Sequence, residues 1–143
     1  MTKDEELAKQ MALIEQYKEQ LSQLETQYSY VQAAINEYTK ARMTVEQLNK
    51  IEDGSDILLP IGGSTFIDAN AKKTSNVLFD VGAGIVLEKS VEEVIKKIDE
   101  RVNSLQRTQE RISSTAQQIQ DEAAETSAKA QKLMEKENNK LFG

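Results

Sequence analysis

Apolar side chains recur at alternating spacings of three and four residues along two long segments, Met1–Asn49 and Ser90–Leu141. A repeat of about 3.5 residues keeps one stripe of a helix facing a partner helix, whereas a plain period of about 3.6 drifts away from it. The sequence therefore predicts two long helices paired as a coiled coil. The predicted stripe comprises Leu7, Gln10, Ile14, Tyr17, Leu21, Leu24, Tyr28, Val31, Ile35, Tyr38, Arg42 and Val45, and then Val91, Ile95, Ile98, Val102, Leu105, Gln109, Ile112, Ala116, Ile119, Ala123, Thr126, Ala130 and Leu133.

The two stripes match in size if the chain folds back on itself. Leu24 then faces Ala116, and large residues opposite small ones allow a coiled coil to pack at the density of a protein interior. In this register Leu21 faces Ile119. A slip of one heptad, which places Leu21 against Thr126, also gives mostly apolar layers, so both registers stay open.

Polar residues interrupt the stripe at Gln10, Arg42, Gln109 and Thr126. Buried polar groups can specify the register of a coiled coil at some cost in stability. An arginine at such a position can equally extend its guanidinium group to solvent. Both interpretations of Arg42 stay open.

Between the helical segments lie four short runs rich in Ile, Val, Leu and Phe, at residues 57–61, 64–69, 76–81 and 84–89. Glycines separate the first run from the second and the third from the fourth, as tight hairpin turns require. Pro60 indicates a sheet edge or a bulge. Ser90 followed by Glu93 has the spacing of a capping box and marks the start of the second helix.

The predicted fold class is therefore mainly α with a small β insert: a long antiparallel two-helix coiled coil joined by two β-hairpins. Three parts are expected: an N-terminal coiled-coil helix at residues 1–50, two hairpins forming an oligomerisation platform at 51–89, and a C-terminal coiled-coil helix at 90–143. Both chain termini then lie together, far from the insert.

Four strands of this length leave unpaired edges and exposed apolar side chains in an isolated chain. We therefore expect the insert to assemble with other chains. The predicted oligomerisation residues are Ile57, Leu59, Ile61, Phe66, Ile67, Val77, Leu78, Phe79, Val81, Ile85, Val86 and Leu87.

Composition excludes most chemistry. The chain has no histidine or cysteine and a formal net charge of −6, which argues against transition-metal sites, thiol chemistry and nucleic-acid binding. A dinucleotide loop at Gly82-Ala83-Gly84 lacks its third glycine, because Leu87 stands there, and no Walker sequence occurs. Carboxylates such as Asp99 and Glu100 fall on solvated helix faces. The sequence predicts no enzyme, no cofactor and no membrane segment, and a soluble cytoplasmic protein.

Several apolar residues near the expected tips lie outside the stripe. Flexible methionine and leucine side chains adapt to varied apolar surfaces, which suits a binder of many partners. The alternative is ordinary fraying of a coiled-coil end, or a local widening of the stripe by Met11 and Leu13. The candidate binding residues are Met11, Leu13, Met134, Leu141 and Phe142, with Leu7, Ile14 and Leu133 added if the ends fray.

The insert sequences LLPIGGSTFIDA and NVLFDVGAGIVLEKS, in their helix–two hairpins–helix context, resemble the α class of archaeal prefoldin subunits. This resemblance implies a hexamer of two α and four β subunits, joined through a β-barrel platform. It also implies an ATP-independent co-chaperone that holds unfolded client proteins at its coiled-coil tips and passes them to a group II chaperonin. The alternative is a structural tether that oligomerises through its insert. A tether explains the helices but leaves the apolar tips without a role.

Overall fold

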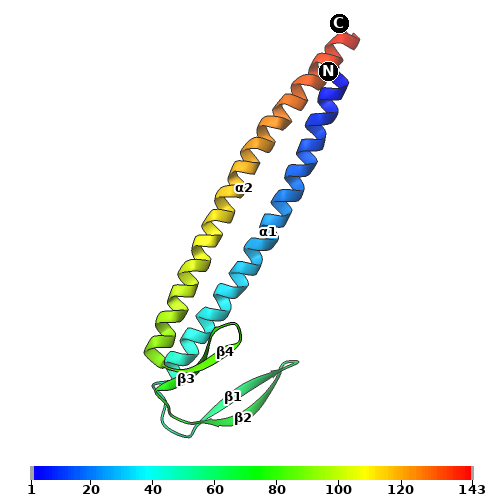
Figure 1. Cartoon of the computed structure of the whole chain (residues 1–143). Helices are drawn as coiled ribbons and strands as arrows, with labels where there is room; N and C mark the ends of the chain where they lie inside the picture. The colour runs from blue at the N-terminus through cyan, green and yellow to red at the C-terminus, as the bar shows by residue number, and fades with distance from the viewer. Residues whose placement is uncertain (1, 143) are drawn as a thin grey trace. The chain divides into compact units, whose positions relative to one another are not determined.

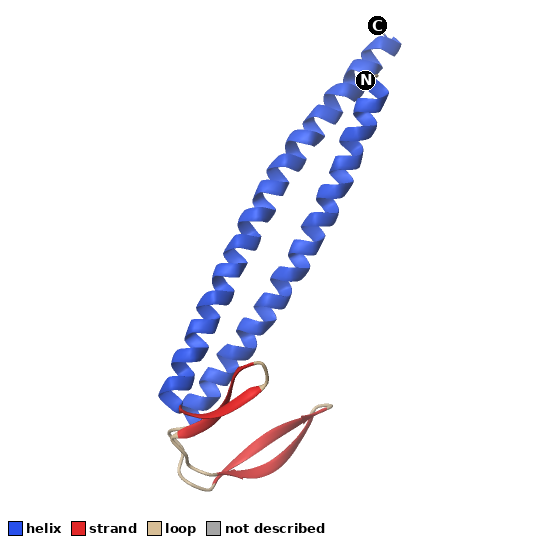
Figure 2. Cartoon of the chain, in the orientation of Figure 1, coloured by secondary structure: helices blue, strands red, loops and turns tan. Residues whose placement is uncertain are grey.

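The computed structural model describes residues 2–142 and the side chains of residues 2–141 (Figure 1). Along the chain, one long helix precedes four short strands and a second long helix follows them, which confirms the predicted fold class (Figure 2). Two compact units form, one from residues up to Ala33 and from Gln106 onward, the other from Ala34–Leu105. The elements are α1 (Lys3–Leu48), β1 (Ser55–Gly62), β2 (Thr65–Ala71), β3 (Asn76–Gly82), β4 (Ile85–Ser90) and α2 (Val91–Phe142).

The first unit is a pair of antiparallel helical segments from α1 and α2 (Figure 1). Thr126 and Ala130 of α2 are buried, as their stripe positions predict. Across the pair, Gln109 Nε2 donates a hydrogen bond of 2.9 Å to Gln32 Oε1. A slip of one heptad would separate these residues by about two helical turns, too far for this bond. The register that places Leu21 near Ile119 is therefore the one observed.

The core of the second unit lies where α2 begins. The buried apolar residues here are Val91, Val94 and Ile98 of α2, with Ala71 at the end of β2, whereas Ile35 of α1 is buried near the other end of the unit. Ile35, Val91 and Ile98 are positions of the predicted stripe, whereas Val94 is buried beside it. The unit is therefore held by the first turns of α2 packing against α1 and the end of a strand.

Of the two hydrogen bonds of the predicted capping box, one is present at the first turn of α2. The amide of Glu93 donates to Ser90 Oγ at 3.2 Å. The Glu93 carboxylate lies 3.8 Å from Lys89 Nζ instead of returning to the Ser90 amide. In addition, the Val91 amide donates to the Ser75 carbonyl at 2.9 Å, which joins the start of α2 to the start of the second hairpin.

The four strands form two separate antiparallel hairpins, β1 with β2 and β3 with β4, which confirms the predicted pairing. Leu59 lies opposite Ile67 in the first hairpin, and Phe79 lies opposite Leu87 in the second. The register shifts between Pro60 and Gly62 in this two-stranded sheet, which agrees with the edge position or bulge predicted at Pro60.

Both hairpins close with two-residue turns of the same backbone type. The φ angles are 55° at Gly63 and 56° at Ser64, then 53° at Ala83 and 76° at Gly84. Two successive positive φ values are the pattern of the type I′ turn, whose twist matches that of the flanking strands. Ala83 has no side-chain hydrogen-bonding group to support this conformation, and it is the less favourable residue of its turn.

Replacing Ala83 by glycine is expected to stabilise the second hairpin by about 0.5–1 kcal/mol, because glycine adopts positive φ without steric cost. Hydrogen exchange of the amides of the substituted hairpin, β3 and β4 for Ala83→Gly and β1 and β2 for the control, measures the change. Ala69→Gly is the matched control, since Ala69 lies in a strand without positive φ and glycine there is expected to reduce stability. Reduced protection in both variants would contradict the strain at Ala83.

Candidate functional site

One face of the first hairpin is largely apolar. Strand alternation and the pairing of Leu59 with Ile67 place the side chains of β1 and β2 alternately on two faces. The apolar face is exposed, although Ile57 and Ala69 are half-buried at its base. We call it the hairpin face. It comprises Ile57, Leu59, Ile61, Ile67 and Ala69.

The opposite face of this hairpin is mixed. Asp56 and Asp68 lie beside Leu58 and Phe66, and Leu58 is 63% exposed. Sequence reasoning predicted Phe66 as an assembly residue but missed Leu58. The run Ile57-Leu58-Leu59 gave no indication which residue would remain in solvent, because apolar residues occupy both faces there.

The second hairpin also exposes apolar side chains. Its outer face carries Leu78 and Val86, both exposed, with Leu78 at 74%. On the other face Val77 and Phe79 are half-buried, while Ile85 and Leu87 stay exposed. The remaining predicted residue, Val81, is also exposed.

Arg101 of α2 holds the second hairpin to both helices of its unit. Its guanidinium carbon lies 4.6 Å from the ring centre of Phe79 and 5.6 Å from that of Tyr38. Arg101 Nη2 donates to the Asp80 carbonyl at 2.8 Å, and Nη1 donates to Tyr38 Oη at 3.1 Å. One cation thus joins β3, α1 and α2. No local pattern in the sequence indicated this role.

Both hairpins keep unpaired strand edges. Each is a two-stranded sheet, so each strand has one edge whose amides and carbonyls lack a neighbouring strand. Exposed edges beside exposed apolar side chains form a template for pairing with another chain. The arrangement is suited to building a larger sheet with other subunits.

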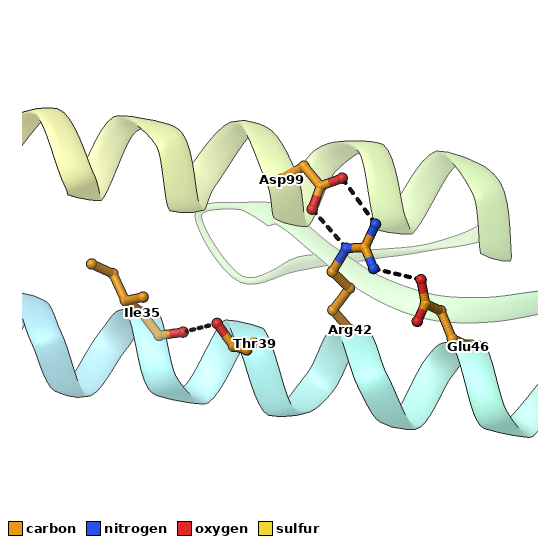
Figure 3. Close-up of polar contacts among 5 residues, drawn as sticks. All are labelled: Ile35, Thr39, Arg42, Glu46 and Asp99. Carbon is orange, nitrogen blue, oxygen red and sulfur yellow. Dashed lines mark hydrogen bonds and ion pairs between the residues drawn. The ribbon is translucent and has the colours of Figure 1, made fainter.

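Arg42 forms an ion pair across the helices of the second unit (Figure 3). Arg42 Nε donates to Asp99 Oδ1 at 2.7 Å, and Nη1 bonds the Glu46 carboxylate on its own helix. The bond to Asp99 is the main cause of the raised pKa of Arg42. Of the two interpretations of Arg42, the contact that specifies register is therefore present. Both side chains are partly exposed, so solvent screens the pair and it contributes little to stability.

The apolar tip candidates differ in exposure. Met11 is 55% exposed, Met134 is 46% exposed and Leu141 is 77% exposed. Leu13 is half-buried, which agrees with the alternative that it widens the stripe. The side chain of Phe142 lies outside the described residues. We call Met11, Met134 and Leu141 the tip surface.

Charged residues of both signs crowd together at the tip, and groups of like sign have the larger effect on the pKa values of Lys3 and Glu137. The neighbouring Lys140 lowers the pKa of Lys3. A hydrogen bond with the Asp4 carboxyl and the charge of that carboxyl raise the pKa of Glu137. Glu137 is half-buried at the heptad position that follows Leu133. The apolar stripe therefore ends at Leu133, and the next stripe position, Glu137, is charged.

Neither described helix has a stretch long and apolar enough to cross a membrane. Within residues 2–142, acidic side chains do not gather in groups of three that would suit a metal ion. The features that stand out are thus the exposed apolar surfaces, which suit contact with other proteins.

Comparison with known proteins gives consistent matches. The family model described as "Prefoldin subunit" matches residues 17–136. "Prefoldin subunit alpha" of Methanococcoides burtonii is 32% identical over 113 residues, covering 79% of this chain and 80% of the relative. "Prefoldin subunit alpha" of Methanococcus vannielii is 29% identical over 119 residues, covering 83% of this chain and 80% of the relative.

Two solved structures share the fold. The cryo-EM structure of filamentous PFD from Methanocaldococcus jannaschii matches with a TM-score of 0.71 at 19% identity, covering 82% of this chain and 98% of that chain. The crystal structure of the prefoldin beta subunit from Thermococcus strain KS-1 matches with a TM-score of 0.57 at 13% identity, covering 88% and 90%.

Proposed function

Since this chain belongs to the prefoldin family of chaperone subunits, we propose that it is an α-type subunit of an ATP-independent co-chaperone. This co-chaperone holds non-native proteins at its coiled-coil tips and passes them to a group II chaperonin. It works in the cytoplasm and requires no cofactor. The observation that carries this proposal is the exposed hairpin face, since an isolated subunit has no use for such a surface.

Assembly is the role of the middle of the chain, residues 51–89. The hairpin face and the free edges of the four strands pair with strands of other subunits. The partners are β-type prefoldin subunits, in a hexamer of two α and four β chains. Burial of Leu59, Ile61 and Ile67 drives the association, because removing apolar area from water releases about 25 cal/mol per Å².

Client holding is the role of the tip surface. A non-native protein exposes apolar patches that a native protein buries, and Met134 and Leu141 offer it flexible apolar contacts. Each contact is weak. Several tips acting on one client raise the effective concentration and hold it without nucleotide, while weak single contacts permit its release to the chaperonin.

The experiment that tests the assembly is size-exclusion chromatography with light scattering, on the chain alone and mixed with a β-type prefoldin subunit. We expect a single mixed species with the mass of a hexamer. Two unchanged peaks would contradict the proposed assembly and favour a structural tether.

Replacing Met134 and Leu141 by serine is expected to weaken client holding several-fold, because both contacts lose their apolar surface. The oligomer should stay intact, since neither residue belongs to the hairpins. The readout is the suppression of aggregation of two unrelated denatured proteins by the mixed assembly.

The matched control replaces Tyr30 and Met43 by serine. Both are large, exposed residues of α1 outside the tip surface, at 74% and 56% exposure. We expect this variant to hold clients as the unaltered chain does. Equal loss of holding in the two variants would show that the tip surface has no special role.

A further inference from the structure

A row of lysines follows one side of the last turns of α2. Lys129, Lys132, Lys136 and Lys140 are spaced by three, four and four residues, which places them on one face of the helix. The positions that face α1 are Thr126, Ala130, Leu133 and Glu137, all buried or half-buried. The lysine row therefore lies on one side of the stripe, and Met134 and Leu141 lie on the other side of the stripe.

This row borders a hollow of about 200 Å³ between the helices of the first unit. Leu133 supplies an apolar wall, and Gln10 supplies hydrogen-bonding groups. Glu6 contributes a single carboxylate against three lysines. The lining residues are Glu6, Gln10, Lys129, Lys132, Leu133 and Lys136. The hollow is large enough for one apolar side chain and is predominantly basic.

The lysines are largely unneutralised. Lys129 Nζ lies 3.6 Å from Glu125 on its own helix. Among the residues that the structure describes, neither Lys132 nor Lys136 has a carboxylate within 4 Å. Lys140 and Lys136 together lower the pKa of Lys3 across the helices, as expected where positive charges crowd. In a chain of net charge −6, this basicity is local.

We propose that this hollow makes the tip selective for client segments in which an apolar side chain is flanked by aspartate or glutamate. The apolar side chain lies against Leu133, and the flanking carboxylates bind Lys132 and Lys136. This inference rests on the proposed client-holding function and specifies which clients the α-type tip prefers. Opposite charges near a protein surface attract strongly enough to discriminate among weak binders, and salt screens the effect.

The test uses three fluorescent peptides with one apolar core, flanked by aspartate, serine or lysine. Fluorescence anisotropy measures their binding to the full chain assembled with a β-type subunit. At low salt the aspartate peptide is expected to bind about tenfold more tightly than the lysine peptide, from two exposed ion pairs gained against two repulsions. At about 1 M salt this preference should disappear, since charges are then screened within about 3 Å.

The variant Lys132→Glu with Lys136→Glu is expected to remove the preference and to leave binding of the serine peptide within about twofold. Lys132→Gln with Lys136→Gln, which removes charge without adding any, should give an intermediate result. The matched control is Lys40→Glu with Lys96→Glu, two exposed lysines outside the hollow that change the net charge equally. Circular dichroism establishes that each variant is folded.

Equal binding of all three peptides to the unaltered assembly would overturn this inference and leave the proposed function standing. An equal shift in the control variant would also overturn it, because the preference would then arise from net charge. Binding of none of the peptides would likewise overturn this inference, while the proposed function is tested separately by the suppression of aggregation.

Discussion

An aspartate in place of Ile67 is expected to abolish assembly with a β-type subunit. Ile67 lies opposite Leu59 at the centre of the hairpin face and is exposed in the single chain. The variant should therefore fold normally. In the assembly the new carboxylate would be buried without a partner, which costs several kcal/mol. A cost of about 4 kcal/mol weakens association about a thousandfold.

Light scattering of the mixed subunits measures this loss, and circular dichroism measures the helical content of the variant. The matched control is Ser64→Asp, which adds one carboxylate to the same hairpin outside the hairpin face. Aspartate tolerates the positive φ of that turn position. Normal assembly of Ile67→Asp would show that partners do not bury the hairpin face.

Removing the Arg101 side chain is expected to release the second hairpin from the helices. Arg101→Ala loses a charge-assisted bond to the Asp80 carbonyl, at about 1.5–3 kcal/mol, and contacts with two aromatic rings, at about 0.5–2 kcal/mol. Because Arg101 is partly exposed, we expect a net loss of about 2 kcal/mol. Amide hydrogens of β3 and β4 should then exchange about 30-fold faster.

The first hairpin provides an internal control: within the described residues no hydrogen bond or ring contact joins Arg101 to β1 or β2, so their amides should exchange unchanged. Arg101→Lys keeps the charge but loses the planar fork that reaches two partners at once. We expect this variant to restore less than half of the lost protection. Unchanged exchange in Arg101→Ala would mean that Phe79 and Val77 hold the hairpin without it.

Local sequence signals predicted the elements well. The heptad spacing indicated both helices, and the glycine-separated apolar runs indicated both hairpins, because these patterns act within a few residues of one another. The register shift after Pro60 agrees with the edge or bulge that proline indicated, but the second hairpin has the same shift between Asp80 and Gly82 without a proline. The strand ends were less certain: β1 begins at Ser55, before the predicted run, since its first pairs involve polar residues.

The candidate sites were predicted less completely. Met11, Met134 and Leu141 are exposed as expected, but Leu13 is half-buried and Leu58 was missed. Exposure depends on which neighbours cover a side chain, and the sequence does not list those neighbours. The lysine row of α2 was visible in the sequence, yet the lack of carboxylate partners for Lys132 and Lys136 became apparent only with the positions of the carboxylates in the described part of the chain.

The sequence by itself determined the order of elements, the hairpin turns and the stripe along which the helices pair, because backbone propensity and hydrophobic periodicity are local properties. Only the tertiary structure decided the register, through Gln32 with Gln109 and Arg42 with Asp99. It also decided that Arg101 joins β3 to both helices. Contacts between residues distant in the chain depend on side-chain reach and geometry in space, and several arrangements satisfy the same apolar pattern.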